Sequence, residues 1–391
     1  MENLKIKNLV IEFRKRIQSG NCFISFNNTL DKHQTRVSLK SSEFIIQIDD
    51  DVHKVDTKDF FEINIKSFHS LLVKDSFISF RFITSNQFDT ELLKVGDTTN
   101  KFQRIKLSVD SNGSEVDVAI KCSNCESSLT TAKDVKVRRI LELPSSNLDI
   151  SEWFCHRHSD EKLFDDAENK CESPSCFNEK TQQFQPKLHD ILHGPFCLLM
   201  NSQLFDKNRM IEKRNQLYCK RCLQSIGESN VNFIRFWWET VKFNNRLFFD
   251  VASTIDLVKL VIRNHLSCDG MTFLTPIVKI IFEATIPNDD KKVHVLIQVM
   301  DRNLQLLKLN LDDFQLVEQS TIKVMFLKLT HSNEDDAKTL KYWQKDVNVT
   351  NYELSCKMFH TLCEYLIAQS ELIPDIYRTN NSFQFSYIQC L

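Results

Sequence analysis

The stretch "LYCKRCLQSIGES", residues 217–229, places Cys219 and Cys222 three positions apart and follows them with a turn-capable Ser-Ile-Gly. An earlier stretch, "KCSNCESS", gives Cys122 and Cys125 the same spacing. A C-x-x-C pair lets two thiolates reach one metal ion while nearby backbone amides hydrogen-bond the sulfurs. Two such pairs supply the tetrahedral set that zinc prefers. We therefore predict one zinc site shared by the four cysteines.

Two alternatives to this shared site remain open: two independent redox pairs, and unligated cysteines in a core. The pairs stand much farther apart than in a compact zinc ribbon, so spacing alone does not decide between them. A site closed by four thiolates has no vacant position for water or substrate, so its role would be structural. We expect such a zinc staple, meaning a metal cross-link between distant segments, to join an N-terminal β domain to a C-terminal domain.

Composition places the chain among soluble globular proteins. Its 391 residues are 42% hydrophobic, and 50 Lys and Arg nearly balance 52 Asp and Glu. This length favours two or three domains over a single core. The net charge of −2 argues against a dedicated nucleic-acid binder, because neutralising phosphates supplies most of that affinity.

The beginning of the chain, "MENLKIKNLVIEFRKRIQSG", is interrupted by charges and has no continuous apolar core, so we predict no secretory signal. No run reaches the roughly 18 apolar residues that a membrane span requires. We expect the protein in the cytoplasm and nucleus. In such reducing compartments, its thirteen cysteines are more often metal ligands, nucleophiles or core residues than disulfides.

Residues 1–121 predict an N-terminal antiparallel β domain. Segments such as "NCFISFNN", "SFISFRFIT" and "VDVAIK" alternate apolar with polar residues and are rich in β-branched and aromatic side chains. We expect a sandwich-like or open-barrel arrangement there. Residues 122–232 are irregular and rich in Cys and His, which suits a region held by metal rather than by a large core.

Residues 233–391 predict a C-terminal mixed α/β domain. Strand patterns return in "NFIRFWWETVKF" and "STIKVMFLKLT". In contrast, "STIDLVKLVIRNHLSC" and "NYELSCKMFHTLCEYLIAQS" place apolar residues at helical spacing. The predicted fold class is α+β and β-rich: an N-terminal antiparallel β domain and a C-terminal sheet with about two helices, joined by the four-cysteine zinc staple.

A second group of metal-ligating residue types begins in "EWFCHRH", which contains Trp153, Cys155 and His156. Further members are His158, Cys171, Cys176, His189 and His193. Three interpretations stay open: a second metal site, a Cys/His nucleophile pair with a lowered thiol pKa, and an aromatic-anchored turn with a buried cysteine. Adjacent residues on a strand point to opposite faces, so Cys155 and His156 would not pair directly.

Several motifs occur in one order along the chain. They are "KCSNC", "RRILELPSSNLDISEWFCH", "GPFCLLMN", "LYCKRCLQSIGES" and the closing "NNSFQFSYIQ". In this order the chain resembles the HECT-like ubiquitin-protein ligases that bind ubiquitin-conjugating enzymes. The resemblance runs in register from about residue 114 to the C-terminus, and the strands before it are compatible but unspecific.

This resemblance implies that the chain binds a charged ubiquitin-conjugating enzyme and promotes ubiquitin transfer to protein substrates. It also implies a link to pre-mRNA 3′-end processing through the endonuclease of the cleavage and polyadenylation machinery. The alternative function is therefore a non-catalytic, zinc-stapled binding partner or assembly factor for that endonuclease. Whether a cysteine becomes thioester-linked to ubiquitin distinguishes the two.

The resemblance also singles out Cys356 as the candidate catalytic residue. A HECT ligase uses a thioester-forming cysteine near its C-terminus, in a loop and after a threonine. In "LSCKMFHTLCEYL", Cys356 stands at about the right distance from the end, with Ser355 in place of threonine. The residues that follow depart from the Phe-Asn of HECT ligases, and Cys356, Phe359 and Cys363 follow helical spacing. Packing on a helix face is therefore the alternative role.

Trp237 and Trp238, in "FWWETVKF", complete the candidate partner-binding residues, with the Trp153, Cys155 and His156 group. Exposed aromatic residues anchor interfaces, whereas aromatics that alternate with polar residues on a strand more often lie in a core. The sequence has no Gly-rich phosphate loop and no H-E-x-x-H motif, which argues against nucleotide hydrolysis and metalloproteolysis. We expect protein partners, with no membrane and no direct nucleic-acid contact.

Overall fold

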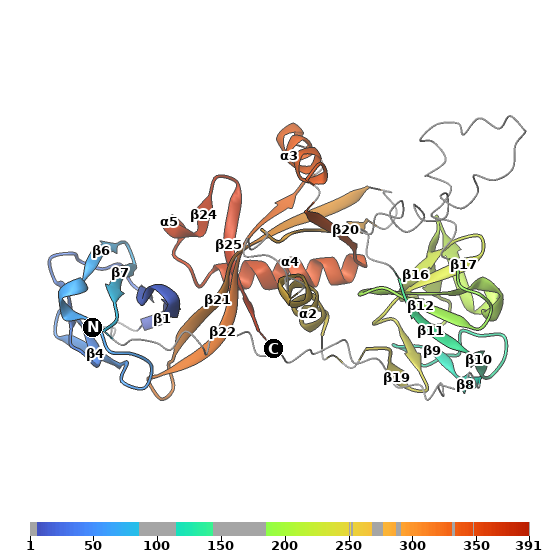
Figure 1. Cartoon of the computed structure of the whole chain (residues 1–391), viewed down its shortest axis with the longest axis horizontal. Coiled ribbons are helices and arrows are strands. Elements are labelled where there is room, and N and C mark those ends of the chain that lie inside the picture. The colour runs from blue at the N-terminus through green and yellow to red at the C-terminus, as the bar shows by residue number, and fades with distance from the viewer. Residues whose placement is uncertain are drawn as a thin grey trace, which may run out of the picture.

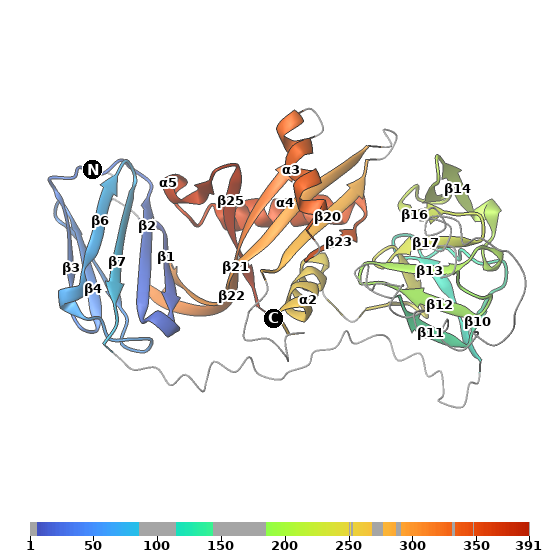
Figure 2. The same cartoon turned by 45° about the horizontal axis from the view of Figure 1, so that its top comes forward.

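The computed structural model arranges the chain as three lobes along one long axis (Figure 1). The structure describes residues 6–85, 115–143, 185–249, 251, 253–267, 277–286, 291–330, 333–346 and 348–390. We call the described residues up to 85 the N-terminal lobe, those between 115 and 249 the cysteine lobe, and those from 253 onward the central lobe. Figure 2 shows the central lobe between the other two.

The N-terminal lobe consists of two antiparallel sheets. One sheet has the order β1-β2-β7-β6 and the other β3-β4-β5. Their bounds are β1 Ile6–Arg14, β2 Ser19–Phe26, β3 Thr35–Leu39, β4 Glu43–Ile48, β5 Asp51–Asp56, β6 His69–Lys74 and β7 Phe77–Ile83, with short 3-10 helices η1 Lys15–Ile17 and η2 Ile65–Ser67. Alternation along β7 buries Ile78, Phe80 and Phe82. Phe80 meets Phe44 of β4 edge to face, with ring centroids 5.5 Å apart, so the two sheets pack face to face.

The cysteine lobe is a seven-stranded sheet, β11-β12-β13-β17-β16-β15-β14, with the smaller sheets β19-β18-β9 and β10-β8. Its strands are β8 Val116–Val118, β9 Ile120–Cys122, β10 Val135–Val137, β11 Arg139–Glu142, β12 Asp190–His193, β13 Cys197–Asn201, β14 Met210–Lys213, β15 Gln216–Cys219, β16 Ser225–Ser229, β17 Phe233–Trp237, β18 Val241–Phe243 and β19 Arg246–Leu247. Two 3-10 helices, η7 Ser202–Leu204 and η8 Lys207–Arg209, connect β13 to β14.

The Ser-Ile-Gly that looked turn-capable belongs to strand β16. Gly227 pairs with Phe236 of β17, and a Cβ added at Gly227 would lie 1.9 Å from the carbonyl oxygen of Arg235. The glycine therefore permits a close approach of two strands rather than a turn.

The central lobe combines the longest strands with four α-helices of the described chain. Its elements are α2 Thr254–Ser267, β20 Lys279–Thr285, β21 Lys292–Asn310, β22 Gln315–Leu329, α3 Glu334–Gln344, β23 Val349–Glu353, α4 Cys356–Ser370, α5 Asp375–Arg378, β24 Thr379–Asn380 and β25 Phe383–Gln389. The two predicted helices correspond to α2 and α4. Helix α3 was missed, although Asn333 caps it by accepting a hydrogen bond from the Asp335 amide.

The hairpin of β21 and β22 connects the central and N-terminal lobes within one ten-stranded sheet. The first part of β21 pairs with β20, from Lys292 to Gln298. Its later part pairs with β1, where Gln305 to Lys308 face Phe13 to Val10. Sequence-distant strands thus share one hydrogen-bonded ladder. The domain boundaries expected above remain a prediction.

The predicted fold class is confirmed in that the described chain is β-rich α+β and the two cysteine pairs meet in one cluster. The cluster lies within the cysteine lobe, so it does not join the N-terminal lobe to the C-terminal part as expected; the β21–β22 hairpin makes that connection. A single apolar core runs from the cysteine lobe into the central lobe, where α2 and α4 contribute Leu257, Val261, Met358 and Leu362. Among the described helices, none has the length and apolar character that crossing a bilayer demands.

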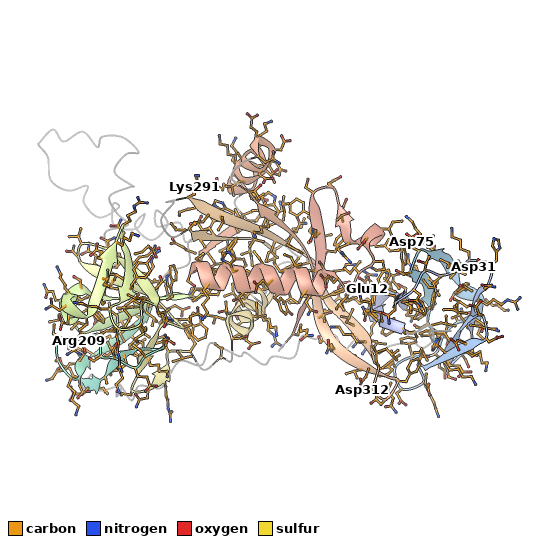
Figure 3. The ribbon with its side chains drawn as sticks, turned by 180° about the vertical axis from the view of Figure 1, so that it is seen from behind. Glu12, Asp31, Asp75, Arg209, Lys291 and Asp312 are labelled. Atoms are coloured by element: carbon orange, nitrogen blue, oxygen red, sulfur yellow. The ribbon has the colours of Figure 1, made fainter. Side chains whose placement is uncertain are left out.

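A buried carboxylate lies where the N-terminal lobe meets the long hairpin, as Figure 3 shows for Glu12. Glu12 of β1 is 0% exposed. It accepts a 2.6 Å hydrogen bond from the Tyr387 hydroxyl of β25 and contacts the Lys323 ammonium of β22. Burial by itself opposes ionisation, but the Lys323 charge and these hydrogen bonds outweigh it and lower the pKa of Glu12.

We predict that Glu12→Gln lowers the free energy of unfolding by about 3 kcal/mol at pH 7, because it leaves the Lys323 ammonium, on a side chain only 15% exposed, without its counter-charge. Since folding lowers the pKa of Glu12, its contribution is full above the unfolded value near 4.5 and is lost as the pH falls through the folded value. Urea titration over a pH series measures both effects.

Glu43→Gln is the matched control, because it removes a carboxylate whose partner, Lys40, is 60% exposed. It should cost less than about 1 kcal/mol. Equal losses for the two variants would contradict a special role for Glu12.

Candidate metal centre and junction cleft

The two cysteine pairs sit in turns of the same geometry. The first follows β9, where the Glu126 amide donates to the Cys122 carbonyl over 3.0 Å. The second follows β15, where the Leu223 amide donates to the Cys219 carbonyl over 2.8 Å. Both Glu126 and Leu223 have a positive φ, 58° and 60°. Each turn therefore reverses the chain sharply and brings the two thiols of its pair close to each other.

The four thiols of Cys122, Cys125, Cys219 and Cys222 converge within the cysteine lobe. Their sulfurs all lie within 4.8 Å of one another. Cys122 Sγ is 3.7 Å from Cys222 Sγ, and Cys125 Sγ is 3.5 Å from Cys219 Sγ. A tetrahedron with metal–sulfur bonds of about 2.3 Å has edges of about 3.8 Å, so the set fits one tetrahedral metal ion. We call it the cysteine cluster.

The thiols of the cysteine cluster differ in acidity. Burial raises the pKa of Cys122 to about 12. Burial also opposes ionisation of Cys125, but hydrogen bonds from the Ser127 hydroxyl and amide outweigh it and lower its pKa to about 6. Cys125 therefore offers a thiolate at neutral pH, whereas Cys122 ionises only with the help of a cation.

Only part of the second group of Cys and His residues lies within the described residues. Trp153, Cys155 and His156 lie outside the described residues, as do His158, Cys171 and Cys176. His193 is buried in β12 against Phe248 and Phe249. Within the described ranges, the cysteine cluster is the group of ligand side chains placed to hold a metal, so a second metal site stays a prediction.

The cysteine lobe meets the central lobe at a cavity of about 200 Å³, which we call the junction cleft. Its lining residues are Gln216, Gln224, Ser225, Glu228, Trp237, Glu239, Thr240, Thr285, Leu354, Ser355, Cys356 and Lys357. Strands β15 to β17 supply one wall, and the turn from β23 into α4 supplies the other. The cleft thus depends on the contact between the two lobes.

Cys356 lies at the first position of α4, on the wall of the junction cleft. The preceding Ser355 caps the helix by accepting a 3.0 Å hydrogen bond from the Met358 amide. Cys356 Sγ is 3.5 Å from His360 Nδ1, and burial raises the pKa of this thiol. Cys363, two turns further, is buried in the core, where burial raises its pKa to about 11.

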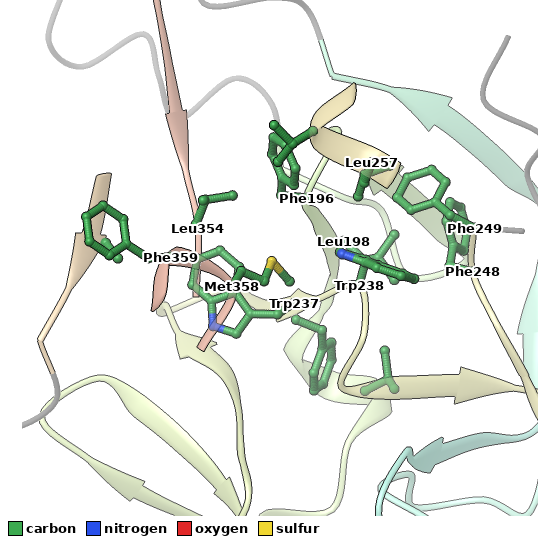
Figure 4. Close-up of a cluster of buried hydrophobic side chains, with 14 of the residues drawn as sticks. Phe196, Leu198, Trp237, Trp238, Phe248, Phe249, Leu257, Leu354, Met358 and Phe359 are labelled. Carbon is green, nitrogen blue, oxygen red and sulfur yellow. The ribbon is translucent and has the colours of Figure 1, made fainter. Parts of the chain in front are cut away.

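Trp237 and Trp238 are both buried, with 3% and 2% exposed. Trp237 lines the junction cleft beside Leu354, and Figure 4 shows its indole near Met358 of α4. Trp238 packs against Phe249, with ring centroids 6.1 Å apart. The Trp237 indole thus lies where the two lobes meet, whereas Trp238 packs within the cysteine lobe, and the role of both in partner binding stays a prediction.

The sequence patterns did not predict a charged network that lies beside the junction cleft. Arg235 of β17 contacts Glu353 of β23 and lies 3.5 Å from Glu228 of β16. Burial, reinforced by the charge of Glu353, raises the pKa of Glu228. These residues come from three strands, and no spacing along the chain relates them, so no sequence motif could have revealed the network.

Metal content tests the cysteine cluster. We predict that purified protein carries one equivalent of metal, that Cys219→Ser carries almost none, and that its melting temperature falls, because metal binding contributes folding free energy. Elemental analysis and thermal melting measure the two effects. Cys390→Ser is the control, since this half-buried cysteine lies outside the cluster and should leave the metal content unchanged. If Cys219→Ser kept its full metal content, the hypothesis that the four cysteines share one metal ion would be wrong.

Comparison with families of known proteins matches residues 12–385 to the family described as "HECT-like Ubiquitin-conjugating enzyme (E2)-binding". Comparisons with curated proteins and with solved structures give no match. The matched residues include the N-terminal lobe from Glu12 onward, the cysteine cluster and the junction cleft. The chain belongs to the family of HECT-like proteins that bind E2 ubiquitin-conjugating enzymes.

Proposed function

We propose that this protein binds a ubiquitin-conjugating enzyme charged with ubiquitin and promotes transfer of the ubiquitin to lysines of protein substrates. The observation that carries the proposal is the family match across residues 12–385. The junction cleft supports it, because a thiol, two carboxylates and an ammonium meet there between two lobes. Such a cleft can hold a reacting group away from bulk water.

Positioning alone is sufficient for this chemistry. Holding the thioester of the conjugating enzyme beside an acceptor amine turns a bimolecular reaction into an effectively unimolecular one. No nucleophile of the ligase is then needed. The raised pKa of Cys356 favours this direct transfer, since a protonated thiol attacks a thioester poorly.

A cysteine relay is the second candidate mechanism, and the position of Cys356 on the cleft wall favours it. In that mechanism the Cys356 sulfur attacks the thioester carbonyl, and the thiolate of the conjugating enzyme leaves. His360 Nδ1 donates a 2.7 Å hydrogen bond to the Cys356 carbonyl, so the thiol proton would pass to the leaving thiolate of the conjugating enzyme. The ubiquitin would then pass from Cys356 to the acceptor amine.

We also propose that the metal of the cysteine cluster is zinc and that its role is structural. Four thiolates with sulfur separations of 3.5 and 3.7 Å suit zinc, whose structural sites are closed and tetrahedral. When bound, zinc would supply a fixed charge that holds all four thiols deprotonated. Cys122 and Cys125 would thereby be held against the β15–β16 hairpin, which forms one wall of the cleft.

The test is a single-turnover reaction between the protein and ubiquitin-loaded conjugating enzymes, with free lysine as acceptor and products separated on a non-reducing gel. We expect at least tenfold faster loss of ubiquitin from a cognate enzyme, a modest part of what proximity can supply. For direct transfer, Cys356→Ala should keep this rate and no variant should show an adduct.

A thiol-sensitive ubiquitin adduct that disappears in Cys356→Ala would establish the relay instead. Cys363→Ala is the matched control because it lies on the same helix but in the core, and Cys155→Ala tests the remaining candidate. No acceleration with any conjugating enzyme, despite intact fold and metal, would overturn transfer. It would favour the non-catalytic role as a partner or assembly factor of the cleavage endonuclease.

A further inference from the structure

The size and walls of the junction cleft indicate what it can hold. Its volume of about 200 Å³ is below the range of about 300–1,000 Å³ that is typical of small-molecule pockets. It therefore suits a single side chain of a partner protein better than a cofactor. Trp237 and Leu354 provide apolar wall, which favours an occupant with an aliphatic stem.

Glu239, which lines the cleft, has a carboxylate oxygen with unused hydrogen-bonding capacity. Glu239 Oε2 accepts a 3.2 Å hydrogen bond from the Thr254 hydroxyl. Glu239 Oε1 is buried and has no hydrogen-bond donor among the described residues. The nearest cation, Lys357 Nζ, is 3.8 Å away on a side chain that is 75% exposed. A buried, ionisable oxygen without a donor calls for a partner.

We propose that the junction cleft receives a lysine side chain of a bound protein, with its methylene stem along Trp237 and Leu354 and its ammonium donating to Glu239 Oε1. Lysine fits better than arginine because one free oxygen matches a single ammonium donor, whereas a guanidinium prefers both oxygens of a carboxylate. The Trp237 indole adds attraction for a cation that passes over its face.

The identity of this lysine as the ubiquitin acceptor rests on the proposed function, whereas the preference of the cleft for an ammonium does not. As acceptor, the ammonium gives one proton to Glu239. The free amine then attacks the thioester carbonyl, a C–N bond forms and the C–S bond breaks. The leaving thiolate takes one of the two amine protons, and the other stays on the nitrogen of the new amide bond. Glu239 would thus act as general base.

Cys356 supplies a probe of the cleft that needs neither ubiquitin nor a conjugating enzyme. Its sulfur attacks a methanethiosulfonate reagent, a mixed disulfide forms and methanesulfinate leaves. We would measure its modification rate by peptide mass spectrometry with the cationic 2-aminoethyl reagent and the anionic 2-sulfonatoethyl reagent. The rate with the 2-aminoethyl reagent is divided by the rate with the 2-sulfonatoethyl reagent. This ratio is then divided by the same ratio for free cysteine, which corrects for the intrinsic reactivity of the two reagents.

We expect this normalised ratio to favour the ammonium reagent about tenfold in the wild-type protein, by charge attraction. Glu239→Gln, which keeps the side-chain shape, should bring it close to one. Lys357→Met removes the competing cation and should raise it by about threefold. A ratio near one in the wild type, or one unchanged in Glu239→Gln, would overturn the lysine site.

The acceptor role has its own readout in the transfer reaction. If the cleft binds the acceptor, Glu239→Gln should raise the free-lysine concentration needed for half-maximal transfer by about tenfold, while binding of the conjugating enzyme stays unchanged. Unchanged lysine dependence, in a protein that still accelerates transfer, would overturn the acceptor assignment alone. Failure of the proposed function would appear differently, as no transfer by the wild type despite a normal reagent ratio.

Discussion

The β21–β22 hairpin is the constraint on which the rest of the molecule depends. The two strands of this hairpin pair along nearly their whole length, from His294 opposite Leu329 to Asn310 opposite Gln315. At one end β21 completes the sheet of the N-terminal lobe, and at the other it pairs with β20. Breaking the backbone hydrogen bonds of a buried sheet costs free energy, because it leaves buried N–H and C=O groups without partners. The buried Glu12 adds an ion pair from β1 to β22 and accepts a hydrogen bond from Tyr387 of β25 at this point.

The cysteine cluster and the junction cleft are physically linked. Gln224, which follows the second cysteine turn, accepts a 2.9 Å hydrogen bond at its backbone carbonyl from the Cys219 amide and also lines the cleft. Strand β16 begins at the next residue and carries Glu228 to the same wall. A metal ion that holds the four thiols therefore holds a cleft wall as well.

The contact between the cysteine lobe and the central lobe is both apolar and charged. Phe196 meets Phe282 and Tyr352 edge to face across this contact. Arg235 and Glu353 form an ion pair beside them. Such a half-buried ion pair contributes little net stability but penalises other arrangements, since a displaced partner leaves an unpaired charge. The aromatic contacts thus supply attraction between the lobes, while the charges define how the lobes align and therefore the shape of the cleft.

The sequence by itself determined the local features. Period-two alternation indicated the strands of the N-terminal lobe, helical spacing indicated α2 and α4, and the repeated C-x-x-C spacing indicated the cysteine cluster. These signals are local, because backbone periodicity and turn geometry act over a few residues. The chain did not reveal that β21 serves two lobes, that Gly227 lies in a strand, or that Glu239, Trp237 and Cys356 share one cleft. Only the tertiary structure decided those points, because they depend on contacts between residues far apart in sequence, which periodicity does not encode.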